Sequence, residues 1–170
     1  MKTDTQIHHG FTLLELLASI IVMSIISVTL MPVIGAASES FAVARQVRSS
    51  TERAGFALDR VTRVIRQAPI GANNTGVGVS SATASSLTFS DGTGFQLIGT
   101  TLEMLVVGND PVPLCLDVDE FQVVYIGDDG VSNTVNTPTT THRFMVRVET
   151  DGIELTTVVH PRVWIGQESS

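Results

Sequence analysis

The sequence predicts an α+β protein in which a long N-terminal helix, one half membrane-embedded and one half amphipathic, packs on a C-terminal antiparallel β-sheet head. Three observations support this fold class. No charged residue occurs from Leu16 to Ser38. Apolar residues then recur with the helical period to about Ala68. After a Gly-rich segment, the period changes to the alternation that is typical of β-strands.

The uncharged run is long enough to cross a membrane. A helix needs about 20 apolar residues to span the hydrocarbon core of a bilayer, and the uncharged stretch from Leu16 to Ser38 has 23 residues, most of them in the apolar run 11–37. An ordinary secretory signal, cleaved near Gly35-Ala36-Ala37, is an alternative, but its apolar core of about 7–15 residues would be shorter. Pro32 lies inside the run. Because proline removes a helical hydrogen bond, we expect a helix kink there.

The amphipathic half is expected to cover residues 38–68. At 100° per residue, apolar side chains share one face and charged side chains the opposite face, while Phe56 falls among the charges. The apolar face holds Val47, Ala54, Leu58, Val61 and Ile65, and the charged face holds Arg45, Glu52, Asp59, Arg63 and Arg66. Pro69 and Gly71 then end the helix.

The remaining residues, 69–170, are expected to form the β-rich globular head. Residues 71–86 are small and polar, which indicates a loop. Strands are expected over 87–89, 95–98, 101–107, 114–126, 143–149 and 153–159, the last two joined by the turn Asp151-Gly152. The single cysteine, Cys115, excludes an internal disulfide. It lies in an apolar run and is expected to be a buried thiol.

Charge is distributed unevenly along the chain, which has a net charge of −7. Residues 39–68 carry a net charge of +3 and residues 69–170 a net charge of −9. An acidic head argues against nucleic acid as a direct partner, because phosphate binding needs a positive surface. The asymmetry also suggests that the basic helix meets acidic heads of neighbouring subunits.

No cluster of residues predicts catalysis or a resident metal ion. The serines lack a nucleophile-elbow context and a partnered histidine, so we expect no catalytic residue and no enzyme activity. His8, His9, His142 and His160 are not accompanied by ligands at metal-binding spacing. Asp117, Asp119, Glu120, Asp128 and Asp129 lack the pattern of a calcium loop. We therefore expect neither a metal nor a cofactor.

The most informative residues are Gly10-Phe11-Thr12-Leu13-Leu14-Glu15, at the border between the polar leader and the apolar run. A carboxylate at this depth in a membrane helix is costly and needs a partner. Cleavage after Gly10 would create an α-amino group on Phe11, which can pair with Glu15 of an adjacent chain. Such a pair would set the axial register of helices packed in a fibre. Gly10 has no side chain to obstruct the scissile bond.

This combination resembles the N-terminus of the type IV filament superfamily, the pilins and the pseudopilins of type II secretion. The resemblance implies that prepilin peptidase removes residues 1–10, that Phe11 is N-methylated, and that Phe11 and Glu15 serve subunit assembly. Residues 11–37 would then be the transmembrane and filament-core helix, with Pro32 where pilins often carry a proline. Residues 51–68 and 119–125 look like minor subunits, namely the J-type pseudopilin and the W- and O-type minor pilins.

The expected function is therefore that of a minor pilin or minor pseudopilin. The subunit would wait in the bacterial inner membrane, in contact with lipid and with its head in the periplasm, until it joins other pilins. The basic helix would by itself favour the opposite orientation, but the cleavage motif favours a periplasmic head. The alternative is a monomeric membrane-anchored protein whose extracytoplasmic head binds a ligand or a cation. A surface pilus, a secretion pseudopilus and a DNA-uptake pilus all remain open.

Overall fold

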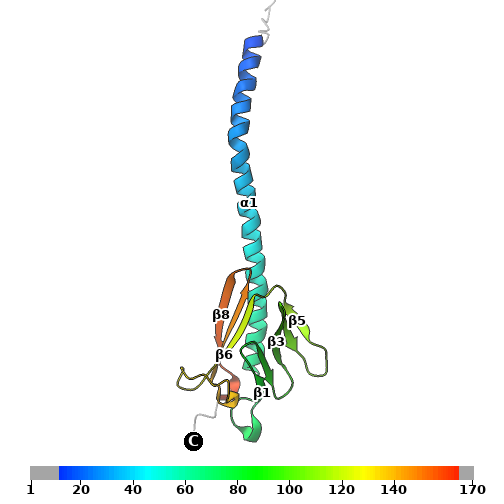
Figure 1. The fold of residues 1–170 in the computed structure, drawn as a ribbon, viewed down its shortest axis with the longest axis vertical. Helices are drawn as coiled ribbons and strands as arrows, with labels where there is room; N and C mark the ends of the chain where they lie inside the picture. Colours follow the sequence, from blue (N-terminus) through cyan, green and yellow to red (C-terminus); the bar gives the residue numbers. More distant parts are fainter. Residues whose placement is uncertain (1–11, 165–170) are drawn as a thin grey trace, which may run out of the picture. The chain divides into compact units, whose positions relative to one another are not determined.

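The computed structural model describes residues 12–164, which form one long helix followed by eight β-strands (Figure 1). The helix, α1, spans Leu13–Arg66. The chain divides into two compact units, and the boundary falls within α1, between Arg45 and Gln46. The second unit contains the C-terminal part of α1 and the β-rich head.

The head-forming part of α1 is amphipathic, as its sequence predicts. Its buried residues are Ser50, Ala54, Ala57, Leu58, Val61 and Ile65. The prediction that Val47 belongs to the buried face is wrong, because Val47 is 48% exposed and burial begins only at Ser50. Phe56 is 65% exposed, in agreement with its place among the charges. Arg63 and Arg66 lie in the last turn, where their positive charge interacts favourably with the negative end of the helix dipole.

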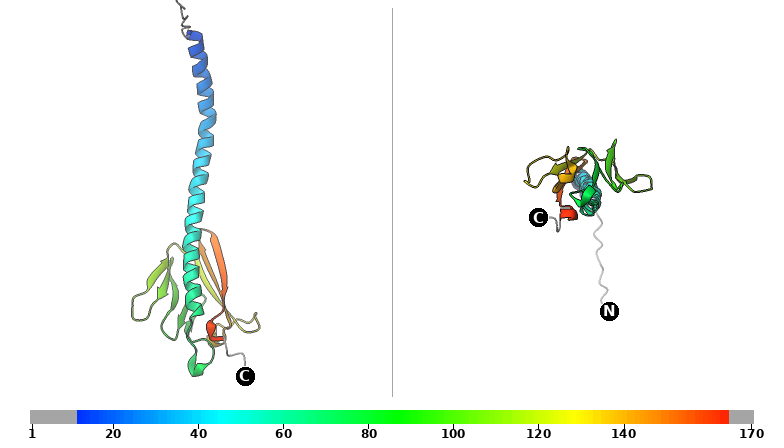
Figure 2. Two further views of the ribbon diagram at one scale, coloured as in Figure 1. Left: turned by 180° about the vertical axis from the view of Figure 1, so that it is seen from behind. Right: turned by 90° about the horizontal axis from the view of Figure 1, so that it is seen from below.

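Two antiparallel sheets pack against this part of α1. Figures 1 and 2 show them side by side on the same helix. The first sheet has the order β1 (Val79–Ala82), β2 (Ser86–Phe89), β3 (Gly94–Ile98), β4 (Thr101–Leu105) and β5 (Val112–Cys115). The second has the order β6 (Glu120–Ile126), β7 (Arg143–Thr150) and β8 (Ile153–Val159). The predicted α+β, pilin-like fold class is therefore confirmed.

The second sheet shows the period of two most clearly. Along β6 and β7 every second residue is buried, and these side chains join the core that also contains Ala54, Val61 and Ile65 of α1. The two-residue turn between β7 and β8 has positive φ at both residues, 51° at Asp151 and 72° at Gly152. Type I′ hairpin turns require this backbone geometry, which explains why the Asp-Gly pair predicted the hairpin correctly.

Tyr125 of β6 joins the two sheets. Its hydroxyl shares its single proton in a bifurcated hydrogen bond with two carbonyl oxygens, that of Thr83 in the β1–β2 turn and that of Ser86 at the start of β2, both at 3.0 Å. The backbone N–H of Val123 donates to the carbonyl of Ala84 at 2.7 Å. The Tyr125 ring is buried and packs edge-to-face on Phe144, with ring centroids 5.6 Å apart. The edge of β6 is therefore covered by the tip of the first hairpin.

Several predicted element boundaries are wrong. The single strand expected over 114–126 is two strands in different sheets, separated at residues 116–119, where Asp117 has φ of 57°. Aspartate tolerates this left-handed conformation better than most residues. The loop expected over 71–86 contains β1, whose Ser80 hydroxyl bonds to two carbonyls of β2 at 3.1 Å. The helix ends at Arg66 rather than Ala68, and β4 ends at Leu105 rather than Val107.

Three short 3₁₀ helices complete the described fold. They are η1 (Ala72–Asn74), η2 (Pro138–Thr140) and η3 (Arg162–Trp164). The last of them is tied to the segment before β7. The indole of Trp164 stacks on His142, with ring centroids 3.8 Å apart, and its N–H donates to the carbonyl of Thr141 at 2.9 Å.

Candidate assembly site

The first turn of α1 is closed by reciprocal hydrogen bonds between Thr12 and Glu15. The Thr12 hydroxyl accepts from the Glu15 backbone N–H at 3.3 Å. The Glu15 carboxylate accepts from the Thr12 backbone N–H and from the Thr12 hydroxyl, both at 3.0 Å. This arrangement is a capping box, in which a Thr at the N-cap and a Glu three residues later satisfy each other's backbone N–H groups.

The capping box gives Glu15 hydrogen-bond donors within its own chain. An ionised carboxylate has about four acceptor positions, and Thr12 occupies only part of them. The carboxylate can therefore hold an additional cationic donor without giving up the cap. Thr12 was not among the predicted site residues, although the spacing Thr-x-x-Glu at the start of an apolar run is a recognisable signal.

Beyond Glu15, the helix exposes only apolar and small side chains for several turns. All described residues from 12 to 49 are exposed in the isolated chain. The hydroxyl groups in the run bond to the carbonyl four residues earlier: Ser19 to Glu15, Ser24 to Ile20 and Ser27 to Met23, each at 2.8 Å. These hydroxyl groups therefore need no hydrogen bond from water inside a membrane. By length and composition, α1 is the one helix among the described residues that could cross a membrane.

The other predicted site residues are Pro32, Gly10 and Phe11. Pro32 lies inside α1, which is assigned as one helix from Leu13 to Arg66, and the kink expected at this proline stays a prediction. Gly10 and Phe11 lie outside the described residues.

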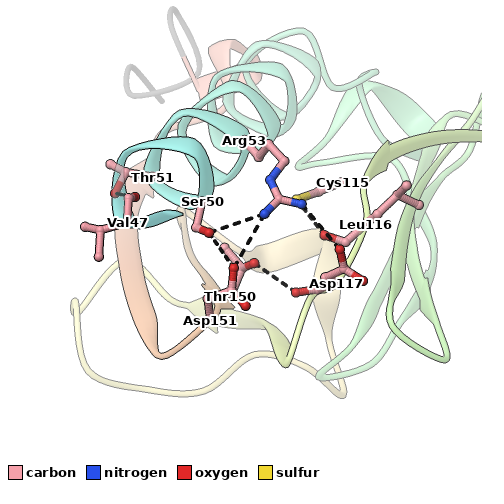
Figure 3. A network of polar contacts seen from close by, with 9 residues as sticks. All are labelled: Val47, Ser50, Thr51, Arg53, Cys115, Leu116, Asp117, Thr150 and Asp151. Atoms are coloured by element: carbon pink, nitrogen blue, oxygen red, sulfur yellow. Dashed lines mark hydrogen bonds and ion pairs between the residues drawn. The ribbon is translucent and has the colours of Figure 1, made fainter. Parts of the chain in front are cut away.

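A second polar cluster fixes α1 to the head (Figure 3). The guanidinium of Arg53 lies 3.3 Å from the carboxylate of Asp117, between β5 and β6, and 3.5 Å from that of Asp151, in the β7–β8 turn. The buried Ser50 hydroxyl donates to the same Asp151 carboxylate. The Thr150 hydroxyl donates to the backbone carbonyl of Asp117 at 2.8 Å.

This cluster links one helical turn to connections from both sheets. Both acidic residues have positive φ, so their carboxylates stand on tight turns that face the helix. The ion pairs are partly exposed and individually weak, but together they fix the position of the turns against α1. Sequence reasoning missed Ser50 and Arg53, because their partners lie 64 to 101 residues further along the chain.

Other titratable groups considered from the sequence have local roles. Cys115 is buried, as predicted, and burial raises the pKa of its thiol. Backbone hydrogen bonds from Val131 and Ser132 lower the pKa of Asp129, which closes its own turn. Among residues 12–164, no three His, Cys, Asp or Glu side chains are placed to hold a metal ion.

Residues 6–31 match the family model of the prokaryotic N-terminal methylation motif. No curated protein is significantly similar to the chain. The matched residues contain the capping box and the first half of the exposed apolar helix. The motif and the apolar helix that it overlaps are typical of membrane-anchored precursors.

This motif marks a type IV pilin- or pseudopilin-like prepilin. The motif implies processing by prepilin peptidase and assembly with other pilins, and this family of proteins is structural rather than enzymatic. Together with the apolar helix, the motif fits a subunit anchored in the inner membrane.

Proposed function

We propose that the protein is a minor pilin or minor pseudopilin that helps to start or cap a type IV pilus or a type II secretion pseudopilus. Residues 1–10 are the leader, 11–37 the transmembrane and filament-core helix, 38–68 the amphipathic helix, and 69–170 the head. Prepilin peptidase cleaves between Gly10 and Phe11. The new N-terminus is methylated, and the head stays in the periplasm until assembly.

The observation that carries this proposal is the Glu15 carboxylate in the first turn of an exposed apolar helix. Thr12 supplies neutral hydrogen-bond donors but no positive charge. The α-amino group of Phe11 in a neighbouring subunit supplies that charge after cleavage. In lipid such an ion pair removes the cost of two isolated charges and aligns the helices axially.

The assignment to a minor subunit is supported by two segments that look like minor pilins and J-type pseudopilins. Residues 51–68 include the part of α1 that packs the head. Residues 119–125 include most of β6, the strand that contacts both β7 and the β1–β2 turn. The likeness therefore lies in residues that build the head rather than only in the shared N-terminal helix.

Substitution of Glu15 tests the assembly mechanism. Glu15→Gln keeps the hydrogen-bonding pattern of a capping box but removes the charge, whereas Glu15→Ala removes both. We expect both variants to be cleaved and both to be depleted at least fivefold from sheared filaments. Glu39→Gln, which removes another exposed carboxylate of α1, is the matched control and should assemble normally. Normal incorporation of Glu15→Ala would refute the pairing mechanism.

Intact mass of the chain extracted from membranes tests the processing step. The proposal requires a mature chain that begins at Phe11 and carries one added methyl group. A chain that keeps Met1, or that is cut near Ala37, would instead support the membrane-anchored binding protein. Protease digestion of spheroplasts tests the orientation, because a periplasmic head is degraded while the cytoplasmic proteins stay intact.

A further inference from the structure

The C-terminal end of α1 and the last described segment of the head line a basic cavity that is half open to solvent. Its volume is about 160 Å³, which is room for several water molecules. It is lined by Asp59, Thr62, Arg63, Arg66, Gln67 and Arg162. Five of these residues come from the end of α1 and the residue after it, and Arg162 comes from η3, almost 100 residues further along the chain.

The cavity has more positive charge than its own residues neutralise. Arg63 pairs with Asp59 at 3.2 Å. Within residues 12–164, no ion pair occupies Arg66 or Arg162, and both side chains are exposed. The helix dipole explains arginines in the last turn of α1. It does not explain Arg162, which belongs to another element.

The segment that carries Arg162 is held in place on its other side. Val163 is buried, and Trp164 stacks on His142 and donates to the carbonyl of Thr141. Arg162 is thus fixed at its backbone, so no main-chain ordering is needed to place its guanidinium beside the cavity. Such preorganisation favours binding of a ligand over a merely solvated charge.

The chemistry of the cavity suits an oxyanion. Guanidinium groups bind carboxylates and phosphates through paired, charge-assisted hydrogen bonds, and Thr62 and Gln67 add neutral donors. Carboxylates are an anion that a pilin-like head can present in quantity, since residues 69–170 of this chain carry twelve acidic side chains against three arginines. Phe56 is two helical turns from Arg63, about 10 Å along α1. It offers an exposed apolar contact on the same side of the helix.

We propose that this cavity binds a carboxylate side chain of a neighbouring pilin-like subunit. The exposed Phe56 packs on apolar residues beside that carboxylate. The proposal rests on assembly with other pilins, not on the assignment as a minor subunit. Free phosphate has the same oxyanion chemistry and is the other possible source of the ligand.

Titration of the full-length chain in detergent micelles tests the ligand class. Hexaglutamate and inorganic phosphate are the probes, and calorimetry together with Trp164 fluorescence reports binding. Trp164 is the only tryptophan of the chain and lies two residues from Arg162. We expect hexaglutamate to bind at low ionic strength, and the double variant Arg66→Glu/Arg162→Glu to raise its Kd at least tenfold. Arg143→Glu, an exposed arginine of the head outside the cavity, should change Kd less than twofold.

Each other outcome of the titration overturns the proposal. If hexaglutamate does not bind, or if Arg143→Glu weakens its binding as much as the double variant does, the cavity is not a specific site. Tighter binding of phosphate than of hexaglutamate would assign the cavity to a free anion. At least tenfold tighter binding of hexaglutamate by Glu168→Gln would assign it to a carboxylate of the chain itself.

An assay in cells separates this inference from the proposed function. In the native filament system, Arg66→Glu/Arg162→Glu should be depleted at least threefold from sheared filaments, while Arg143→Glu is incorporated normally. If Glu15→Ala is excluded but the double variant enters at normal levels, the cavity proposal is wrong and the filament function stands. If Glu15→Ala enters normally, the proposed mechanism fails, and the titration still decides whether the cavity binds carboxylates.

Discussion

Removal of one hydroxyl group, in Tyr125→Phe, should weaken the head measurably. The ring stays in place against Phe144, so apolar packing is preserved, but the bifurcated hydrogen bond of the phenol to the carbonyl oxygens of Thr83 and Ser86 is lost. A neutral hydrogen bond contributes about 0.5–1.5 kcal/mol to stability. We therefore expect the free energy of unfolding of the head to fall by about 0.5–1.5 kcal/mol.

Urea unfolding of the full-length chain in detergent measures this change. The single tryptophan, Trp164, belongs to the head, so its fluorescence follows the head and not the apolar helix. Thr156→Val is the matched control. It removes a hydroxyl from an exposed position of β8, and it should change the free energy of unfolding by less than about 0.5 kcal/mol. A loss for Tyr125→Phe no larger than that of the control would refute the reasoning.

The pH dependence gives an independent readout of the same residue. Burial raises the pKa of Tyr125 far above its ordinary value, so the unfolded chain loses the phenolic proton first. The stability contributed by the neutral phenol is complete below about pH 10 and is lost as pH rises beyond it, by about 1.4 kcal/mol per unit. Because Tyr125 is the only tyrosine, Tyr125→Phe should lack this loss. Parallel pH profiles of the two proteins would show that the phenol is not buried in the native head.

Three further predictions concern the other sites. Arg53→Gln removes two partly exposed ion pairs, to Asp117 and Asp151, and should lower the free energy of unfolding by about 1 kcal/mol. Because salt screens these pairs, the loss measured in urea titrations should be smaller at high salt. An equal loss at low and high salt would contradict the electrostatic explanation. Thr12→Val removes the hydroxyl that caps α1 and should deplete the subunit severalfold from sheared filaments. Thr12→Ser keeps a capping hydroxyl and should assemble normally. Equal incorporation of the two variants would show that the cap does not contribute to assembly. Cys115 is buried, and burial raises the pKa of its thiol. The thiol should therefore resist iodoacetamide at pH 8 in the native chain and react fully in urea, as measured by intact mass. Rapid modification of the native chain would disprove the burial of Cys115.

The long helix and the class of the head were predictable because each rests on a local pattern. An uncharged run followed by a 3.6-residue period defines α1, and Asp151-Gly152 between alternating segments defines the β7–β8 hairpin. The break between β5 and β6 was not predictable in this way. Leu116, Asp117, Val118 and Asp119 continue the apolar–polar alternation of a strand, although the chain changes sheets there. Pairing partners elsewhere in the chain, β4 and β7, decide that break.

The candidate sites likewise divide into those that a local sequence pattern reveals and those that depend on contacts between distant residues. The cleavage motif and Glu15 are local, and so is the Thr12–Glu15 capping box, which the sequence displays at the spacing i, i+3. The Arg53 cluster and the basic cavity join residues far apart in sequence, Arg53 with Asp117 and Asp151, and Arg66 with Arg162. No periodicity or motif marks such contacts, because they exist only once the sheets have packed on α1.

The order of the strands has a consequence for how quickly the head forms. In both sheets every strand pairs with the strand next to it in sequence, and the chain crosses from one sheet to the other once. Except for residues 127–142 between β6 and β7, the loops that close these pairs are short, so little chain entropy is lost before most of the pairs form. We expect the head to fold hairpin by hairpin, with α1 as the surface on which the hairpins dock. A subunit stored in a membrane beside many similar chains benefits, since its strand edges are unpaired only briefly and have little time to aggregate.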